Sequence, residues 1–104
     1  MSREQDGRID IRGIEFEWYP PKALSNLKKH KVSFQEASSI FADRKLLELP
    51  DREHSEGELR FLGIGRSNQD RLLFVNFTIR GEKFRIISAR LAESWERREY
   101  EIAN

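Results

Sequence analysis

The first third of the chain changes from an alternating to a helical pattern of apolar residues. Residues 14–18 (Ile-Glu-Phe-Glu-Trp) alternate apolar and acidic side chains, which is typical of a half-buried strand. Pro20 and Pro21 end this run and suit the first turn of a helix, because a backbone N–H there has no intrahelical partner to lose. We expect a helix that reaches about Lys29 and buries its apolar residues, namely Ala23, Leu24 and Leu27.

A second helix is predicted after a short basic turn. Ser33 can accept a hydrogen bond from the backbone of Glu36, whose side chain can reach back, so the pair fits a capping box. The apolar residues of the second helix recur three or four positions apart, which predicts one buried face made of Phe34, Ala37, Ile40 and Phe41. After this helix, residues 45–49 are predicted to form a short strand that Pro50 ends.

Three longer runs with the composition of strands occupy residues 59–66, 71–79 and 83–90. Their connections are short enough only for antiparallel hairpins. A charged helix at residues 92–101 follows, with a thin apolar side at Trp95, Tyr100 and Ile102. This order of elements predicts an α+β fold in which two N-terminal helices pack on a mainly antiparallel β-sheet, with a C-terminal helix.

The chain length of 104 residues allows one hydrophobic core. We expect residues 13–104 to form a single domain. Residues 1–12 are polar and charged, so we expect a mobile N-terminal extension there, with a short extended piece at residues 9–11.

The hairpin lengths decide which side chains share a face of the sheet. We predict that Arg66 lies opposite Arg71, and Ile79 opposite Glu82. One face is then almost wholly apolar and needs the two helices to cover it. This predicted covered face carries Leu62, Ile64, Leu73, Val75, Phe77, Phe84, Ile86 and Ser88.

The opposite face of the predicted sheet is mixed in polarity. Gly63 and Gly65 leave a shallow floor, and glycine within a strand often marks a close approach to the backbone. This floor predicts a basic cleft, unless the C-terminal helix covers it and one of its glutamates pairs with Arg85. The other residues predicted on this face are Leu59, Phe61, Leu72, Phe74, Asn76, Thr78, Lys83, Ile87 and Ala89.

Composition excludes several kinds of protein. The chain has no cysteine, so it has no disulfide framework, thiol nucleophile or zinc–thiolate site, and two histidines are too few for a histidine-rich metal site. No apolar run approaches the roughly 18 residues of a membrane span, and the N-terminus lacks the apolar stretch of a signal peptide. We expect a cytoplasmic protein with no metal, no cofactor and no membrane partner.

The charge is unevenly distributed along the chain. The formal net charge is only +1, but residues 60–90 contain seven basic and two acidic side chains, and the rest of the chain sums to −4. Such asymmetry indicates an anionic partner for the basic region. The alternative is an ordinary solvated surface.

Ordered motifs run across residues 14–101. They include Phe16-Glu17-Trp18, Asn26-Leu27-Lys28-Lys29-His30, Val32-Ser33-Phe34-Gln35-Glu36-Ala37, His54-Ser55-Glu56-Gly57-Glu58 and Arg85-Ile86-Ile87-Ser88-Ala89-Arg90. Together these motifs resemble the BrnT family of toxins. The resemblance implies a RelE-like fold, a ribonuclease that arrests translation, and a cognate antitoxin with a ribbon–helix–helix DNA-binding part. It also implies that operator DNA is bound only through the complex with that antitoxin.

Three positions depart from the residues that the family often has. Tyr19 stands in place of aspartate, Lys31 in place of glycine, and Glu93 in place of threonine or serine. All three lie at predicted helix boundaries, so we expect weaker caps or turns, by roughly 0.5–2 kcal/mol each.

The implied chemistry assigns roles to residue types. RNA cleavage without a metal needs a base for the ribose 2′-OH, a cation for the charge on the phosphate, and an acid for the leaving 5′-oxygen. Arginine suits the second role, since its planar fork can hold two phosphate oxygens; the candidates are Arg80, Arg85 and Arg90. The candidates for proton transfer are His54, Glu58 and Tyr100. Further RNA contacts are expected from Lys28, Lys29, Arg60, Arg66 and Lys83.

Alternatives stay open for these residues. Lys28 and Lys29 also complement the dipole of the first helix, and Glu58 can pair with Arg60 rather than act as a base. For the whole protein, the alternative is a binding module whose basic face holds an acidic protein or nucleic acid without catalysis.

Overall fold

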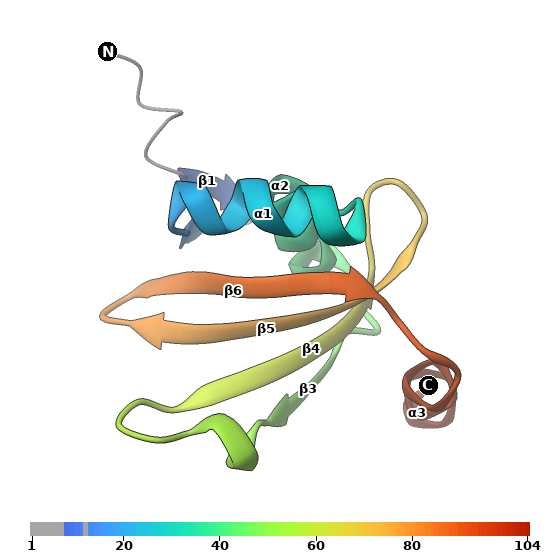
Figure 1. The fold of residues 1–104 in the computed structure, drawn as a ribbon. Coiled ribbons are helices and arrows are strands. Elements are labelled where there is room, and N and C mark those ends of the chain that lie inside the picture. Colours follow the sequence, from blue (N-terminus) through green and yellow to red (C-terminus); the bar gives the residue numbers. More distant parts are fainter. Residues whose placement is uncertain (1–7, 12) are drawn as a thin grey trace.

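Six strands form one mixed sheet in the order β1–β2–β6–β5–β4–β3 (Figure 1). The computed structural model describes residues 8–11 and 13–104, so the predicted mobile extension lies outside the described residues apart from residues 8–11, which form β1. All neighbouring strands are antiparallel except β2 and β6, which are parallel. The strands are β1 (Arg8–Ile11), β2 (Ile14–Glu17), β3 (Leu47–Pro50), β4 (Arg60–Arg66), β5 (Leu72–Arg80) and β6 (Lys83–Leu91).

The helices lie on different sides of this sheet. Figure 1 shows α1 and α2 together on one face and α3 beyond the end of β6. We call the face under α1 and α2 the covered face, and the other the open face. The predicted α+β class and the antiparallel hairpins of the second half are confirmed. The helical segments are α1 (Pro20–His30), α2 (Phe34–Ser38), η2 (Ser39–Ala42), η3 (Arg52–His54) and α3 (Ser94–Ala103).

The core lies between the covered face and the segment α2–η2. The four apolar residues predicted to form the buried face of the second helix are indeed buried, with Phe41 the most exposed at 8%. The Phe41 ring lies 5.0 Å from the rings of Phe16 and Phe77, and 5.4 Å from that of Phe84. Burial of apolar area at about 25 cal/mol per Å² is the main stabilising contribution for a domain of this size.

The predicted register of the β4–β5 hairpin is wrong by one residue. Arg66 lies opposite Leu72 rather than Arg71. The loop takes one more residue than predicted, because Asp70 adopts the left-handed backbone conformation with φ 61°. A shift of one residue moves every side chain of a strand to the other face. The residues of β4 that exchange faces relative to the prediction are Phe61, Leu62, Gly63, Ile64 and Gly65.

A second irregularity lies between β5 and β6. Asn76 pairs with Ser88 but Phe77 pairs with Ile86, so Ile87 is an extra residue in β6. Ser88 therefore lies on the open face and Ala89 on the covered face, the reverse of the prediction. The predicted partner of Ile79 was also wrong, since Ile79 lies opposite Phe84, but this shift of two residues leaves the faces unchanged.

The two glycines of β4 allow the core to close and do not form the floor of a cleft. A Cβ atom at Gly65 would lie 3.0 Å from the Cβ of Ile40 and 3.0 Å from Leu46 Cδ1, and one at Gly63 would lie 3.3 Å from Ile40 Cδ1. Both positions are tight, so glycine lets η2 approach the sheet closely.

The inward face of α1 also differs from the prediction. Leu24 and Leu27 are 61% and 43% exposed, whereas Asn26 is buried. The Asn26 side chain donates to the carbonyl oxygens of Val32 and Ala89 and accepts from the Ala89 N–H. These three hydrogen bonds fix the rotation of the helix on β6 and turn its leucines outward.

The C-terminal helix covers only one end of the open face. Tyr100 is buried against Ile64 and Leu72, while Trp95 and Ile102 are more than half exposed. The end of the open face that carries Arg85 is not covered by α3, and Arg85 pairs with Glu17 of β2 rather than with a glutamate of α3.

Candidate functional site

Three arginines converge on one pocket of the open face. Arg60 lies opposite Thr78, which in turn lies opposite Arg85, so β4, β5 and β6 each place one residue in the same row. Arg80 follows one row further along β5. The volume of this pocket, which we call the arginine pocket, is about 210 Å³. Its other lining residues are Tyr19, Lys22, Glu58, Ile86 and Ile87.

The guanidinium groups of this pocket are loosely held. Arg85 Nη1 lies 3.3 Å from a carboxylate oxygen of Glu17, and Arg80 Nη2 lies 3.3 Å from one of Glu58. Arg60 Nε is buried and, in the described part of the chain, has no hydrogen-bond partner. A buried donor without a partner costs free energy, and no contact within the described residues offsets this cost.

A histidine–aspartate pair lies at the neighbouring loop. His54 ends η3, and its Nδ1 is 2.8 Å from Asp51 Oδ2. Asp51 is buried, whereas the His54 side chain is 61% exposed. Asn76 Nδ2 donates to the same aspartate oxygen at 3.1 Å, and the Ser88 hydroxyl donates to Asn76 Oδ1 at 3.2 Å. The carboxylate is thus fixed from the sheet and in turn fixes one nitrogen of the imidazole.

Backbone and register place this pair beside the arginine pocket. The Asp51 N–H donates to the carbonyl of Arg60 at 2.8 Å. Asn76, which binds Asp51, is two residues from Thr78 on the same face of β5, a spacing of about 7 Å. One region of the open face therefore combines a cationic pocket that can bind an anion with an exposed imidazole that can transfer a proton.

Arg90 lies at the other end of the open face. Its two terminal nitrogens bind the two oxygens of Glu96 at 2.8 and 2.7 Å, and its guanidinium lies 4.3 Å from the centre of the Phe74 ring. Glu96 is fully buried. Phe74 is four residues from Thr78 on β5, roughly 13 Å along the strand. The structure does not bring Arg90 together with the arginine pocket.

Tyr100 also lies at that end. Its hydroxyl donates to Asp43 at 2.6 Å. Burial raises the pKa of Tyr100, and the hydrogen bond to the Asp43 carboxylate raises it further. The neutral phenol is therefore favoured, and Tyr100 joins α3 to the turn after η2.

The predicted RNA contacts are divided among three places. Arg60 lines the arginine pocket, and Lys83 lies opposite Arg80 at its edge. Arg66 lies at the far end of β4, 3.6 Å from Asp70. Lys28 and Lys29 lie on α1, on the side of the covered face. Glu58 pairs with Arg80 and not with Arg60 as one alternative held.

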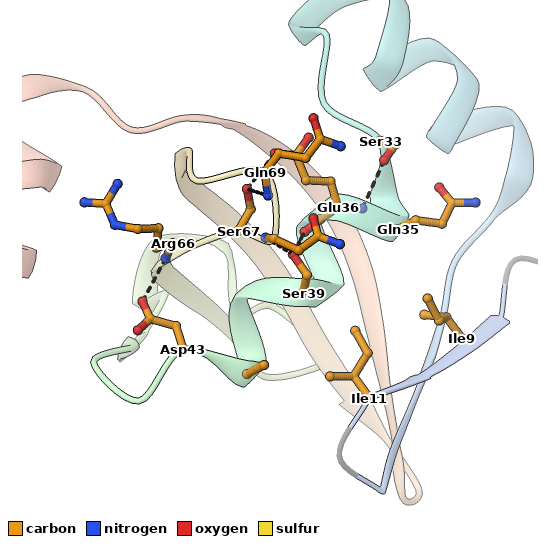
Figure 2. Close-up of a pocket in the computed structure, with 12 residues that line it drawn as sticks. Ile9, Ile11, Ser33, Gln35, Glu36, Ser39, Asp43, Arg66, Ser67 and Gln69 are labelled. Atoms are coloured by element: carbon orange, nitrogen blue, oxygen red, sulfur yellow. Dashed lines mark hydrogen bonds between the residues drawn. The ribbon is translucent and has the colours of Figure 1, made fainter.

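Another hollow of the described structure lies elsewhere, and its carboxylates are engaged in hydrogen bonds. It has a volume of about 570 Å³ and lies between β1, the α2–η2 segment and the β4–β5 loop (Figure 2). Asp43 accepts from the Arg66 N–H, and Glu36 accepts from the Ser67 hydroxyl and from Arg71. The hydrogen bond from Arg71 lowers the pKa of Glu36 against the effect of burial. These bonds join the loop to α2, so this hollow is a feature of the fold.

Glu36 therefore fulfils only half of the predicted capping box. The Ser33 hydroxyl accepts the Glu36 N–H at 3.0 Å, as predicted. The Glu36 side chain turns instead to Arg71, whose Nε lies 2.9 Å from it. A charged partner from the residue before β5 thus replaces the backbone N–H that the box would have used.

Sequence reasoning missed Asp51 and the role of Asn76. Asp51 precedes His54 by three residues, directly after the proline that ends β3, and this Asp-x-x-His spacing was the available signal. The contact of Asn76 with Asp51 depends on the pairing of β3, β4 and β5, which no local pattern indicates.

Residues 8–11 and 13–104 contain neither a metal-binding cluster nor a membrane-spanning helix. No group of three histidine, aspartate or glutamate side chains there is arranged to hold a metal ion. No helix of this part is long and apolar enough to cross a membrane.

Comparison with known proteins agrees with the motifs of the sequence. A family model described as the ribonuclease toxin BrnT of type II toxin–antitoxin systems matches residues 18–96. The fold is similar to the crystal structure of the Brucella abortus ribonuclease toxin BrnT, with a TM-score of 0.58 and 24% identity over 74% of this chain and 94% of that chain. No protein with a curated function matches the sequence significantly. Since the family model spans well over half of the sequence, the chain belongs to the BrnT family of ribonuclease toxins of type II toxin–antitoxin systems.

Proposed function

We propose that this chain cleaves RNA at the arginine pocket. The observation that carries the proposal is the placement of three loosely held arginines in one pocket, beside a histidine that a buried aspartate orients. An RNA phosphodiester is an anion whose cleavage requires both charge stabilisation and proton transfer. The family description as a ribonuclease toxin supports the same substrate.

In the proposed reaction, His54 takes the proton of a ribose 2′-OH and the 2′-oxygen forms a bond to phosphorus. The bond from phosphorus to the 5′-oxygen breaks, and this oxygen leaves with a proton from water. The products are a 2′,3′-cyclic phosphate and a 5′-hydroxyl. Asp51 is a positioning residue, because it acts only through the imidazole that it holds.

The arginines bind the phosphate and stabilise the charge that grows on it in the transition state. Arg60 and Arg85 flank Thr78 in one row, so they can hold different oxygens of one phosphate, while Arg80 lies at the next row. In such sites, the loss of one positioned donor lowers the rate by about 10²- to 10³-fold. Lys22 and Lys83 lie at the rim and suit neighbouring phosphates.

As a toxin, the chain would arrest translation and growth by cleaving cellular RNA in the cytoplasm, on a RelE-like scaffold. Its cognate antitoxin would neutralise it, and we expect that antitoxin to carry a ribbon–helix–helix part that takes the complex to operator DNA. The type II family supports a protein antitoxin.

The direct test is cleavage of a 5′-labelled RNA by the purified chain. We expect cyclic-phosphate ends that also form in EDTA, since the proposed steps use no metal. His54→Ala should slow cleavage by about 100-fold. His30→Ala is the matched control, because His30 lies at the end of α1 and should leave the rate unchanged.

Two results would contradict this proposal. Intact RNA with folded protein would favour a non-catalytic binding module, and equal rates for the two histidine variants would remove His54 from the chemistry. In cells, expression of the chain alone should arrest growth, and co-expression of the antitoxin should restore it.

A further inference from the structure

The outward face of α1 carries two exposed leucines. Leu24 and Leu27 point outward at 61% and 43% exposure, while the residue that faces β6 is the polar Asn26. Single exposed leucines are common on protein surfaces, but neighbouring ones beside apolar hollows indicate a binding surface.

Two hollows lie beside these two leucines, and Leu24 lines both of them. One has a volume of about 470 Å³ and is formed with Pro21, Lys28 and Lys29. The other has a volume of about 240 Å³ and reaches towards α2, with Leu27, Trp18 and Phe34 in its lining. The leucines thus stand between two shallow apolar depressions, a shape that suits side chains projecting from another helix.

The same surface is strongly basic. Residues 18–35 contain four lysines and no aspartate or glutamate. Lys28 and Lys29 line the larger hollow. Neither forms an ion pair with a carboxylate of the described residues. The helix dipole accounts for the lysines in the last turn, but it does not account for the exposed leucines beside them.

We propose that this surface of α1 docks an acidic amphipathic helix of the antitoxin. Apolar side chains of that helix, spaced three or four residues apart, fill the two hollows beside Leu24 and Leu27, and carboxylates at its edge pair with Lys28 and Lys29. The identity of the partner as an antitoxin rests on the function proposed above, whereas its chemistry rests on the surface alone.

A protein fits this surface better than RNA does. Phosphate binding needs cations with donors directed to the backbone of the nucleic acid, and it gains nothing from two exposed leucines. The arginine pocket includes one residue of α1, Lys22, but the two hollows beside the leucines share no lining residue with that pocket. A segment on α1 can therefore bind without entering the proposed active site.

The test is the binding kinetics of the full-length chain with its purified antitoxin at two salt concentrations. The double variant L24S/L27S should raise Kd by about tenfold or more, mainly through faster dissociation, without loss of thermal stability. The double variant K28E/K29E should slow association at low salt, with a smaller difference at high salt. Matched controls on α3 are Ile102→Ser, which is 72% exposed, and R97E/R98E, which are also exposed.

Each outcome decides the proposal. Unchanged affinity in both α1 variants, or a larger loss in the α3 controls, would overturn it. RNA cleavage by the same variants separates the remaining possibilities. Unchanged cleavage with weakened antitoxin binding supports the proposal, whereas a raised KM for RNA with normal antitoxin binding would assign the surface to RNA. The binding result can be read even if the chain proves not to cleave RNA.

Discussion

The arginines of the sheet fall into two sets that differ in their partners. Arg71 and Arg90 each direct two nitrogens to one carboxylate, and those carboxylates, Glu36 and Glu96, have side-chain exposures of 2% and 0%. In the pocket, Arg80 and Arg85 each have one contact of 3.3 Å, to glutamates whose side chains are 34% and 20% exposed, and Arg60 Nε has no hydrogen-bond partner in the described structure.

This difference separates structural from functional arginines by their surroundings. A buried carboxylate is costly to desolvate and needs its arginine, so that arginine is not available to a ligand. A solvent-accessible pair with one long contact contributes at most about 1 kcal/mol, so its arginine can exchange the glutamate for a phosphate. We therefore assign Arg71 and Arg90 to the fold and the pocket arginines to RNA, and the following changes test that assignment.

The largest effect on stability is expected for Arg71→Met. It leaves Glu36 buried without its counter-charge, which should lower the free energy of unfolding by about 3 kcal/mol and the thermal midpoint by more than about 10 °C. Circular dichroism measures the midpoint. The double variant R71M/E36Q should recover part of the loss, and a midpoint equal to that of the wild type in R71M would contradict the structural assignment.

Asp51→Asn should lower kcat by about tenfold or more with little change in KM, because the isosteric amide keeps the packing but holds the imidazole less well. The test is the double variant: in the H54A background, Asp51→Asn should have no further effect on kcat. Additive losses would mean that Asp51 acts on its own or through the fold.

Acid should destabilise the fold through the carboxylates that hydrogen bonds hold in their charged form. The hydrogen bond from Arg71 lowers the pKa of Glu36 below its ordinary value of 4.5. For Asp43, burial raises the pKa, but hydrogen bonds from Tyr100 and the backbone more than compensate and lower it below 3.8. Groups with lowered pKa stabilise the fold above the pKa of the unfolded chain, and this contribution is lost as the pH falls through the folded value.

Unfolding by urea should therefore show a falling midpoint from about pH 5 downwards. The loss should be shallower in R71M, which lacks the contact that lowers the pKa of Glu36. An equal slope in R71M and the wild type would show that Glu36 does not contribute to the acid response.

The smallest effect is expected for Lys31→Gly, which removes only a side chain and keeps the Lys31 carbonyl that accepts from Arg71 Nη2. Lys31 ends α1 in the left-handed conformation with φ 60°, where a Cβ costs roughly 1 kcal/mol that glycine avoids. We expect a thermal midpoint higher by a few degrees and unchanged cleavage. A lower midpoint would mean that the Lys31 side-chain bond to the Lys28 carbonyl matters more than the backbone strain.

Periodicity predicted the elements that depend on local pattern. The strands of the second half and the buried face of α2–η2 follow from apolar spacing, and the structure has them within a residue or two. The register of β4 did not follow, because Asp70 takes a left-handed conformation that its residue type does not announce. The orientation of α1 was missed because one polar residue, Asn26, outweighs two leucines once it binds the backbone of β6.

The candidate site was predictable only in its parts. Charge and residue type indicated Arg85, Arg80 and His54 as separate candidates. Which arginine belongs to the site depends on which carboxylates the fold buries, since Arg80, Arg85 and Arg90 look alike in a basic segment of sequence. Glu96 is buried because α3 closes one end of the open face. The residues in that contact form a cluster separate from the main core of the sheet.

The most direct measurement of the central claim compares Arg85→Met with Arg90→Met, the same substitution in each set. Cleavage rate and thermal midpoint are measured on both variants, with cleavage at about 10 °C so that both are folded. R85M should lose about 100-fold or more in kcat/KM with a midpoint near that of the wild type. R90M should lose more than about 10 °C in its midpoint and keep its kcat/KM. Loss of cleavage in folded R90M, with full cleavage in R85M, would contradict the assignment and move the active site to the α3 end of the open face.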